Sequence, residues 1–346
     1  MIARSISRPV WERLGERPFA GRVLATFEHA CNLITSDNNL VTLVLPPVGN
    51  GPLNIVVDGR PGDLAAIEPG MSAWLEGRRL QVGGLEVALE RAGIWEPRPD
   101  WDRLRAHRDT FTDRLPLLQA LSLHHASADS LLTLISNRGS EPHEAISFAQ
   151  EIAALPSATP RAAPRAGPTG RGPSGRGPRR EARRESGVAV AVARHDRQKV
   201  GSFGFTSDAL FAVAQEAAEA LRAGWEGDRA RLQRGAAQLA GLGGGLTPAG
   251  DDFLIGVMLW GWLAHLTPDS FCRLLFEAAA PRTMALSAAF LRAASEGECS
   301  ASWHRLLDAL QGGAEVGELD QAVREVLSHG STSGADTLAG FLWMAK

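Results

Sequence analysis

The composition of the chain breaks sharply between Ser157 and Ser186, where proline, glycine, alanine and arginine leave almost no large apolar side chain. Such a segment buries too little surface to offset the loss of chain entropy, so it is predicted to be a disordered linker. The linker divides a chain of 346 residues into two folded regions, which fits about two ordinary domains. The boundaries predicted on this basis are 1–98, 99–156, 157–186 and 187–346.

Charge separates the linker from the folded regions. The linker has a net charge of +6, so the rest of the chain has −9 within a total of −3. An arginine-rich tether for RNA or for an acidic partner is one interpretation, but a solvated linker is favoured and no nucleic-acid partner is expected. The only lysines are Lys199 and Lys346, which excludes a phosphate loop ending in Gly-Lys. An anion must therefore be held by backbone N–H groups, hydroxyls and arginine.

The two folded regions differ in their periodicity. Before Pro99, short β-rich runs alternate with turn dipeptides such as Asp58-Gly59 and Gly83-Gly84, which predicts an antiparallel sheet or small barrel. Residues 99–155 change to a helical pattern. After the linker, glycine and proline delimit a series of predicted helices that includes 248–266 and 333–344. The predicted fold class is α+β, with a β-rich N-terminal region and a predominantly helical C-terminal region.

Compartment is inferred from the cysteines and the apolar runs. Cys31, Cys272 and Cys299 have no paired spacing, so they are interpreted as reduced thiols. The N-terminus has no continuous apolar core typical of a secretory signal. The longest apolar run, 253–266, is shorter than the ~20 residues that span a bilayer. A cytoplasmic protein without membrane contact is expected.

The most informative segment is the glycine-rich stretch 241–256. Thr247 is the expected N-cap of the following helix, with Pro248 in its first position. Consecutive glycines allow backbone N–H groups to approach a ligand, and a helix start adds unpaired donors that suit phosphate or carboxylate. Asp251 and Asp252 would compete with an anion there, unless they bind a cation or a substrate amide. Alternatively, they only favour the helix dipole.

A second segment, 329–336, resembles the first in its small residues, hydroxyls and aspartate. Ser333 and Asp336 match the pattern of a capping box. The spacing from Thr332 to Asp336 repeats the spacing from Thr247 to Asp251. If the two helix starts face each other, their hydroxyls, N–H groups and carboxylates converge on one pocket; otherwise they are two structural caps.

These motifs also carry a family resemblance. The strings 244–256 and 329–340, together with the looser N-terminal strings 21–33 and 50–58, resemble a bacterial family of domains of unknown function. That family includes the small subunit of oxamate carbamoyltransferase, from anaerobic allantoin degradation. The resemblance covers most of the chain outside the linker.

The resemblance implies a subunit of a carbamoyltransferase complex that exchanges a carbamoyl group between carbamoyl phosphate and oxamate, giving oxalurate and phosphate. The implied partners are an acyl-CoA-synthetase-like subunit and a larger subunit of another family of unknown function. The acceptor remains open, and so does an alternative role as a non-catalytic assembly subunit that binds a small carboxylate. A third alternative is a hydrolase with a metal at the aspartates.

Carbamoyl transfer needs donors for phosphate and carbonyl oxygens and acceptors for amide hydrogens. We expect Asp251, Asp252 and Asp336 to accept amide hydrogens or to hold a divalent cation, and His329 to move a proton. No cofactor is assigned with certainty. The residues expected to bind the substrate are Gly243, Gly244, Gly245, Thr247, Ser331, Thr332, Ser333 and Arg282.

Weaker signals have structural interpretations beside the functional ones. A metal site formed by His124, His125, Asp129 and His143 is less favoured than a helical core position for His125, so no metal ligand is assigned. His195-Asp196 is interpreted as a strand end rather than a catalytic dyad. Thr283 and Ser287, which follow Arg282, are interpreted as helix residues that only secondarily line a pocket.

Overall fold

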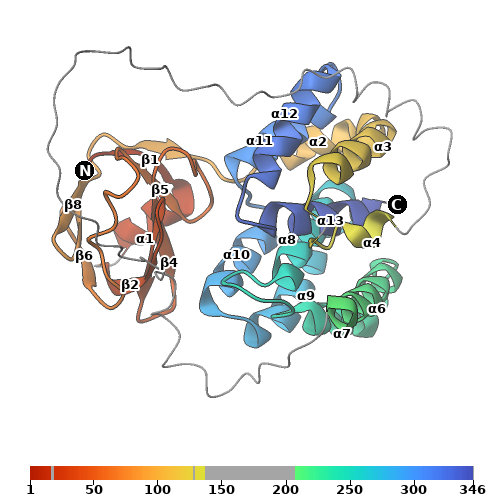
Figure 1. Cartoon of the computed structure of the whole chain (residues 1–346), viewed down its shortest axis with the longest axis horizontal. Helices are drawn as coiled ribbons and strands as arrows, with labels where there is room; N and C mark the ends of the chain where they lie inside the picture. The colour runs from red at the N-terminus through yellow and green to blue at the C-terminus, as the bar shows by residue number, and fades with distance from the viewer. Residues whose placement is uncertain (17–18, 128, 137–206, 346) are drawn as a thin grey trace, which may run out of the picture.

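The computed structural model describes residues 1–16, 19–127, 129–136 and 207–345. The predicted linker, 157–186, lies outside these residues. A strand-rich N-terminal region and a helical C-terminal region lie side by side (Figure 1), so the predicted α+β fold is confirmed.

The N-terminal region is one curled sheet with the strand order β8-β7-β6-β2-β3-β4-β5-β1-β9. Most neighbours are antiparallel, but β4–β5 and β1–β9 are parallel. The sheet curls far enough for a bridge between Ile2 and Ala88 to join its β8 edge to the start of β1. The strands are β1 (Ala3–Ser7), β2 (Ala20–Thr26), β3 (Ala30–Thr35), β4 (Leu40–Val44), β5 (Asn54–Val57), β6 (Ser72–Glu76), β7 (Arg79–Val82), β8 (Leu85–Ala88) and β9 (Gly93–Trp95).

Apolar side chains on the inner face of the sheet form its core. Ile6, Leu33, Leu43 and Ile55 come from four different strands and are fully buried. Helix α1 (Arg8–Glu16) adds Val10 and Leu14 to this core. Strands β6 and β7 alternate between buried and more exposed positions, as expected for a sheet with one solvated face, whereas β4 is buried along its whole length.

The helices are α2 (Trp101–Ala106), α3 (Arg108–His125), α4 (Thr133–Ser136), α6 (Ser207–Trp225), α7 (Arg229–Leu239), α8 (Ala249–Ala264), α9 (Pro268–Ala279), η1 (Ala280–Arg282), α10 (Ala285–Ser295), α11 (Ala301–Leu310), α12 (Val316–Leu327) and α13 (Ser333–Ala345). Helices α8 and α13 lie at the centre (Figure 1). Both are apolar on nearly all sides and buried along most of their length, as expected for helices enclosed by others.

Residues before the linker contribute to the same helical core. Trp101, Leu104 and Phe111 of α2 and α3 are buried in one cluster with Phe253 and Trp343 of α8 and α13. The helical residues 101–136 therefore pack with 207–345, although the predicted linker separates them in sequence.

A smaller contact joins the sheet to the helices. Leu40 and Leu53 of the N-terminal region pack with Leu286 of α10 in a separate apolar cluster. Two backbone hydrogen bonds also join the sheet region to the helices. They run from Cys299 N–H to Pro97 O at 2.9 Å and from Ala301 N–H to Asn50 O at 3.0 Å.

The apolar helices and the cysteines are the two features on which the expected compartment depended. Among the described residues, no helix combines the length and the apolar character needed to span a bilayer. Cys31, Cys272 and Cys299 are all free and buried.

Candidate functional site

The glycine-rich segment forms a tight loop between α7 and α8. Gly241, Gly243 and Gly245 have φ angles of +73°, +112° and +90°, a region that side chains with a Cβ rarely adopt. A Cβ on Gly243 would lie 2.9 Å from Ala249 N, so this position also needs the close approach that only glycine permits. Within the described residues, the N–H groups of Gly243, Gly244 and Gly245 donate no hydrogen bond. The loop therefore has backbone donors available for a ligand.

Helix α8 begins one residue later than expected. Pro248, not Thr247, is the N-cap, and its carbonyl accepts the N–H groups of Asp251 at 2.9 Å and Asp252 at 3.2 Å. The predicted Thr247 cap is therefore wrong. The Thr247 hydroxyl instead lies 3.0 Å from the Ser333 hydroxyl at the start of α13. Because the N–H groups of Gly250, Asp251 and Asp252 are already paired, the unpaired donors here are those of Ala249 and of the preceding loop.

The start of α13 also differs from its predicted cap. Ser333 is the first helical residue, and Asp336 N–H donates to Thr332 O at 2.8 Å rather than to the Ser333 side chain. The Asp336 carboxylate accepts the Leu131 N–H at 2.7 Å. The predicted capping box is therefore not formed, since both side chains face partners outside their own helix.

Two glycines bring the helix starts together. A Cβ on Gly256 of α8 would lie 1.9 Å from Thr337 O, and a Cβ on Gly340 of α13 would lie 1.9 Å from Phe253 O. The backbones of α8 and α13 therefore touch directly, in the close packing that small residues allow. The contact is reciprocal, because each glycine faces the carbonyl of the fifth residue of the other helix.

This crossing shows which residues of the two helices are equivalent. Gly250, Asp252, Leu254 and Gly256 occupy the second, fourth, sixth and eighth positions of α8, and residues 334, 336, 338 and 340 of α13 have the same identities. The shared pattern is Gly-x-Asp-x-Leu-x-Gly. The repeat predicted from sequence matched Asp336 with Asp251, whereas the helical positions match it with Asp252.

Asp251 is fully engaged by the protein. It is 1% exposed, and its Oδ1 accepts the Gly241 N–H at 2.9 Å while its Oδ2 accepts the Thr283 hydroxyl. Burial raises the pKa of Asp251, and the hydrogen bonds from Thr283, Gly241 and Ser287 oppose the rise. Its carboxylate fastens the glycine loop to the segment before α10.

Asp252 and Asp336 are buried but incompletely paired. They are 5% and 0% exposed, and in the described part of the chain Oδ2 of each has no hydrogen-bond partner. Burial raises the pKa of Asp252 to about 8, and the charges of Asp336 and Asp251 add to the rise. Burial likewise raises the pKa of Asp336 to about 6. A buried carboxyl oxygen without a partner is costly, which marks this pair for a role beyond packing.

The hydroxyls expected at the site are less buried than the carboxyls, and three of them act on the carboxyl pair. Ser333 and Thr247 are half-buried, and their hydroxyls act on Asp252 by lowering its pKa. Thr332 is half-buried and acts on Asp336 in the same way. Ser331 is exposed on the turn before α13.

Two expected residues do not join the carboxyls. The His329 ring places Nδ1 3.1 Å from Glu325 O, in the last turn of the preceding helix α12. The Arg282 side chain is exposed, and only its carbonyl approaches the loop, 2.8 Å from where a Gly241 Cβ would lie. Neither side chain contacts an aspartate of the site.

Sequence reasoning missed one contributor and underrated two. Leu131 supplies its backbone N–H to Asp336 from a region 205 residues away, and a backbone donor leaves no trace in residue type. Thr283 and Ser287 bond Asp251 and the Leu246 carbonyl. Their position just before and within α10, close to a predicted anion-binding arginine, was the available signal.

The histidine cluster has a structural explanation. His125 Nε2 lies 2.6 Å from Asp320 Oδ1, and Asp320 also pairs with Arg324. Across the described ranges, no three His, Cys, Asp or Glu residues are grouped so that they could hold a metal. His143, His195 and Asp196 lie outside the described residues.

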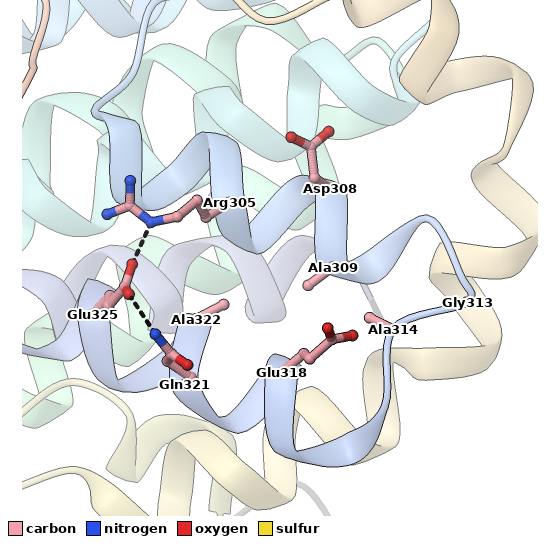
Figure 2. Close-up of a pocket in the computed structure, with 9 residues that line it drawn as sticks. All are labelled: Arg305, Asp308, Ala309, Gly313, Ala314, Glu318, Gln321, Ala322 and Glu325. Carbon is pink, nitrogen blue, oxygen red and sulfur yellow. Dashed lines mark hydrogen bonds and ion pairs between the residues drawn. The ribbon is translucent and has the colours of Figure 1, made fainter.

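A surface pocket between α11 and α12 contrasts with the carboxyl pair. Figure 2 shows Arg305 paired with Glu325, and Gln321 donating to the same carboxylate. The distance from Gln321 Nε2 to Glu325 Oε1 is 3.2 Å. Asp308 pairs with Arg103 at 2.6 Å, and Glu318 accepts the Glu315 N–H at 3.0 Å as part of a capping box. The polar groups of this pocket are satisfied by the protein itself, so it is not the candidate site.

Comparison with known proteins identifies the family. Residues 239–345, which contain both helix starts, match the model of the oxamate carbamoyltransferase subunit AllH, and residues 2–94 match the AllH family N-terminal domain. No curated protein and no solved structure matches significantly. The family is a subunit of oxamate carbamoyltransferase, an enzyme of several subunits. The chain belongs to the AllH family of oxamate carbamoyltransferase subunits.

Proposed function

We propose that this chain contributes the carbamoyl-transfer site of its complex, formed where α8 and α13 begin. The observation that supports this most is the pair of buried carboxyls, Asp252 and Asp336, each with an unpartnered oxygen at equivalent positions of two touching helices. Family membership supplies the reaction class.

The reaction joins carbamoyl phosphate and oxamate. The amide nitrogen of oxamate forms a bond to the carbamoyl carbon, the bond from that carbon to the phosphate oxygen breaks, and one proton leaves the nitrogen. The products are oxalurate and hydrogen phosphate, so the proton lost by nitrogen ends on phosphate. The site must therefore hold an anion, move one proton and stabilise charge on oxygen.

The glycine loop is suited to the phosphate. Its free N–H groups at Gly243, Gly244 and Gly245 lie next to the Thr247–Ser333 hydroxyl pair, and two helix starts direct their positive ends towards the same region. The positive ends of the two helix dipoles also disfavour a cation between the helix starts. Ser331, Thr332 and the exposed guanidinium of Arg282 are proposed to complete the anion site.

The two carboxyls are suited to proton transfer. With a pKa of about 8, Asp252 is mostly protonated at neutral pH, whereas Asp336, with about 6, is mostly ionised. Two neighbouring carboxyls whose pKa values differ in this way can serve as a general acid and a general base. Because the two groups interact, these apparent pKa values belong to the pair. We assign Asp336 to accept the proton from nitrogen and Asp252 to donate to the departing phosphate oxygen, and transfer of the proton from Asp336 to Asp252 then restores both groups. Asp251 is a positioning residue.

Burial favours a second candidate. Because all three aspartates are at most 5% exposed, they could serve only to join the helix starts, in a non-catalytic subunit that binds a small carboxylate and assembles the complex. The partners proposed from the family resemblance are an acyl-CoA-synthetase-like subunit and a larger subunit.

Phosphate release from carbamoyl phosphate in the presence of oxamate separates the candidates. In the complex reconstituted with its partner subunits, Asp252→Asn should lower the rate about a hundredfold or more. Asp251→Asn keeps an acceptor for Gly241 and is the matched control, expected to change the rate by less than about tenfold. Full activity of the Asp252→Asn complex would support the assembly role instead.

A further inference from the structure

A second cavity lies between the two regions of the chain, beside the carboxyl site. It has a volume of about 360 Å³ and separates the β3–β4 turn from helix α10. Ala285, Ala288 and Ala289 recur on the face of α10 that lines it, and their small side chains leave the space open. Ligand sites commonly form at domain boundaries of this kind.

Three polar side chains that line the cavity, Arg292, Asn39 and Glu298, form no ion pair or hydrogen bond with one another. The Arg292 guanidinium lies 5.8 Å from the Phe276 ring centroid and has no carboxylate partner within the residues described. The side-chain amide of Asn39 and the carboxylate of Glu298 likewise form no hydrogen bond in the described part of the chain. A cavity lined by a cation, a carboxyl and an amide therefore has unused capacity for a polar ligand.

Thr283 connects this cavity to the carboxyl site. It lines the cavity, and its hydroxyl donates to Asp251, which in turn accepts from the glycine loop at Gly241. Because the hydroxyl hydrogen is directed to Asp251, the lone pairs of the Thr283 oxygen remain free to accept a hydrogen bond. A ligand with N–H groups fits this acceptor.

The mixture of charges narrows the ligand class. Arg292 suits a carboxylate, while Glu296 and Glu298, on the same wall, disfavour a second negative charge and accept amide hydrogens. Burial raises the pKa of Glu298 to about 7, and the neighbouring charge of Glu296 adds to the rise, which is opposed by Arg13 and Arg98. Arg13 and Asp37 from the N-terminal region also face the cavity.

We propose that this cavity between the curled sheet and α10 binds a small carboxylate that also bears a primary amide, the class that includes oxamate, and so holds the acceptor before it moves to the carboxyl pair for transfer, since neither Asp252 nor Asp336 lines the cavity. The inference rests on the proposed function for the identity of the acceptor. Arg292 pairs with the carboxylate of the ligand, and Thr283 with Glu298 accepts its amide hydrogens.

Calorimetric titration of the full-length chain with oxamate tests this site. The wild type should bind oxamate with a dissociation constant below about 1 mM, and oxalate about tenfold more weakly because its second carboxylate faces Glu296 and Glu298. Arg292→Gln should weaken oxamate binding about tenfold or more. Arg273→Gln is the matched control, an exposed arginine on α9 without a partner among the described residues, and should leave binding unchanged.

A second variant fills the cavity without changing its charge. Ala288→Leu should also weaken oxamate binding, and circular dichroism would establish that both variants remain folded. Equal oxamate affinity in wild type and Arg292→Gln, equal affinity for oxalate and oxamate, or no binding of oxamate by the wild type would each overturn the proposal.

The outcomes separate this proposal from the proposed function. Asp252→Asn should bind oxamate normally, since Asp252 does not line the cavity. If phosphate release survives Asp252→Asn while Arg292→Gln loses oxamate binding, the acceptor site stands and the assignment of the carboxyl pair fails. If Asp252→Asn abolishes release while Arg292→Gln binds oxamate normally, the carboxyl pair stands and the acceptor site fails.

Discussion

The start of α8 and the start of α13 share the pattern Gly-x-Asp-x-Leu-x-Gly, but their surroundings differ. Helix α8 follows a loop with three glycines at positive φ and has an additional aspartate, Asp251, where α13 has Ala335. Helix α13 follows a short turn, and its Asp336 is held by Leu131 from before the linker. The shared positions make the helix contact and the carboxyl pair, whereas the differing positions build the loop.

The shared glycines should produce the largest effect on stability. In Gly256→Ala or Gly340→Ala, the new methyl group would meet a backbone carbonyl of the other helix, which cannot move aside as a side chain can. We expect each substitution to lower the free energy of unfolding by more than about 3 kcal/mol, measured by urea denaturation.

Gly317 offers a control for these substitutions. It lies in the first turn of α12, and a Cβ there would meet nothing within 4 Å. Gly317→Ala should therefore change stability by no more than about 1 kcal/mol, in the stabilising direction. If Gly256→Ala is as well tolerated as Gly317→Ala, the direct contact between α8 and α13 is wrong.

The aspartate present only on α8 should show the next largest effect. Asp251→Ala removes the acceptor of both the Gly241 N–H and the Thr283 hydroxyl, and should cost about 2–4 kcal/mol of unfolding free energy. Asp252→Asn should cost less, because its Oδ2 has no partner to lose among the residues described. Equal losses in the two variants would contradict the division between a positioning and a functional aspartate.

The dependence of stability on pH tests the burial of Asp252 separately from the substitutions above. Since the pKa of Asp252 is raised from 3.8 to about 8 on folding, the native state binds more protons than the unfolded state across that interval. This group therefore stabilises the fold less and less as the pH rises from about 4 to about 8. Asp252→Asn should remove this contribution, so its stability relative to wild type should improve between about pH 5 and about pH 8 in urea denaturation. A constant difference across that range would refute a buried, protonated Asp252.

The sequence supplied the α+β class and both helix starts because these depend on local patterns. The run of apolar residues after Asp252 and the alternation in the strands are periodic, and periodicity can be recognised without tertiary contacts. The caps at Thr247 and Ser333 were wrong, since each hydroxyl is drawn to the other across the helix crossing.

The equivalence of Asp252 with Asp336 could be recognised only from the tertiary structure. Sequence spacing from the preceding threonine favoured Asp251, and only the glycine contact between the helices fixes the correct alignment. The donor to Asp336 is a backbone N–H of Leu131, which no side-chain pattern reveals. Contacts made through the backbone or across a helix crossing could therefore not be predicted from the sequence, whereas the loop and its aspartates could.

The central claim is that Asp252 and Asp336 work as one unit. The most direct test is phosphate release by the reconstituted complex with Asp252→Asn, Asp336→Asn and the double variant. Groups that act together lose activity non-additively, so the double variant should be no more than about threefold slower than the slower single variant. Independent effects that multiply in the double variant, or single variants with wild-type rates, would contradict the claim.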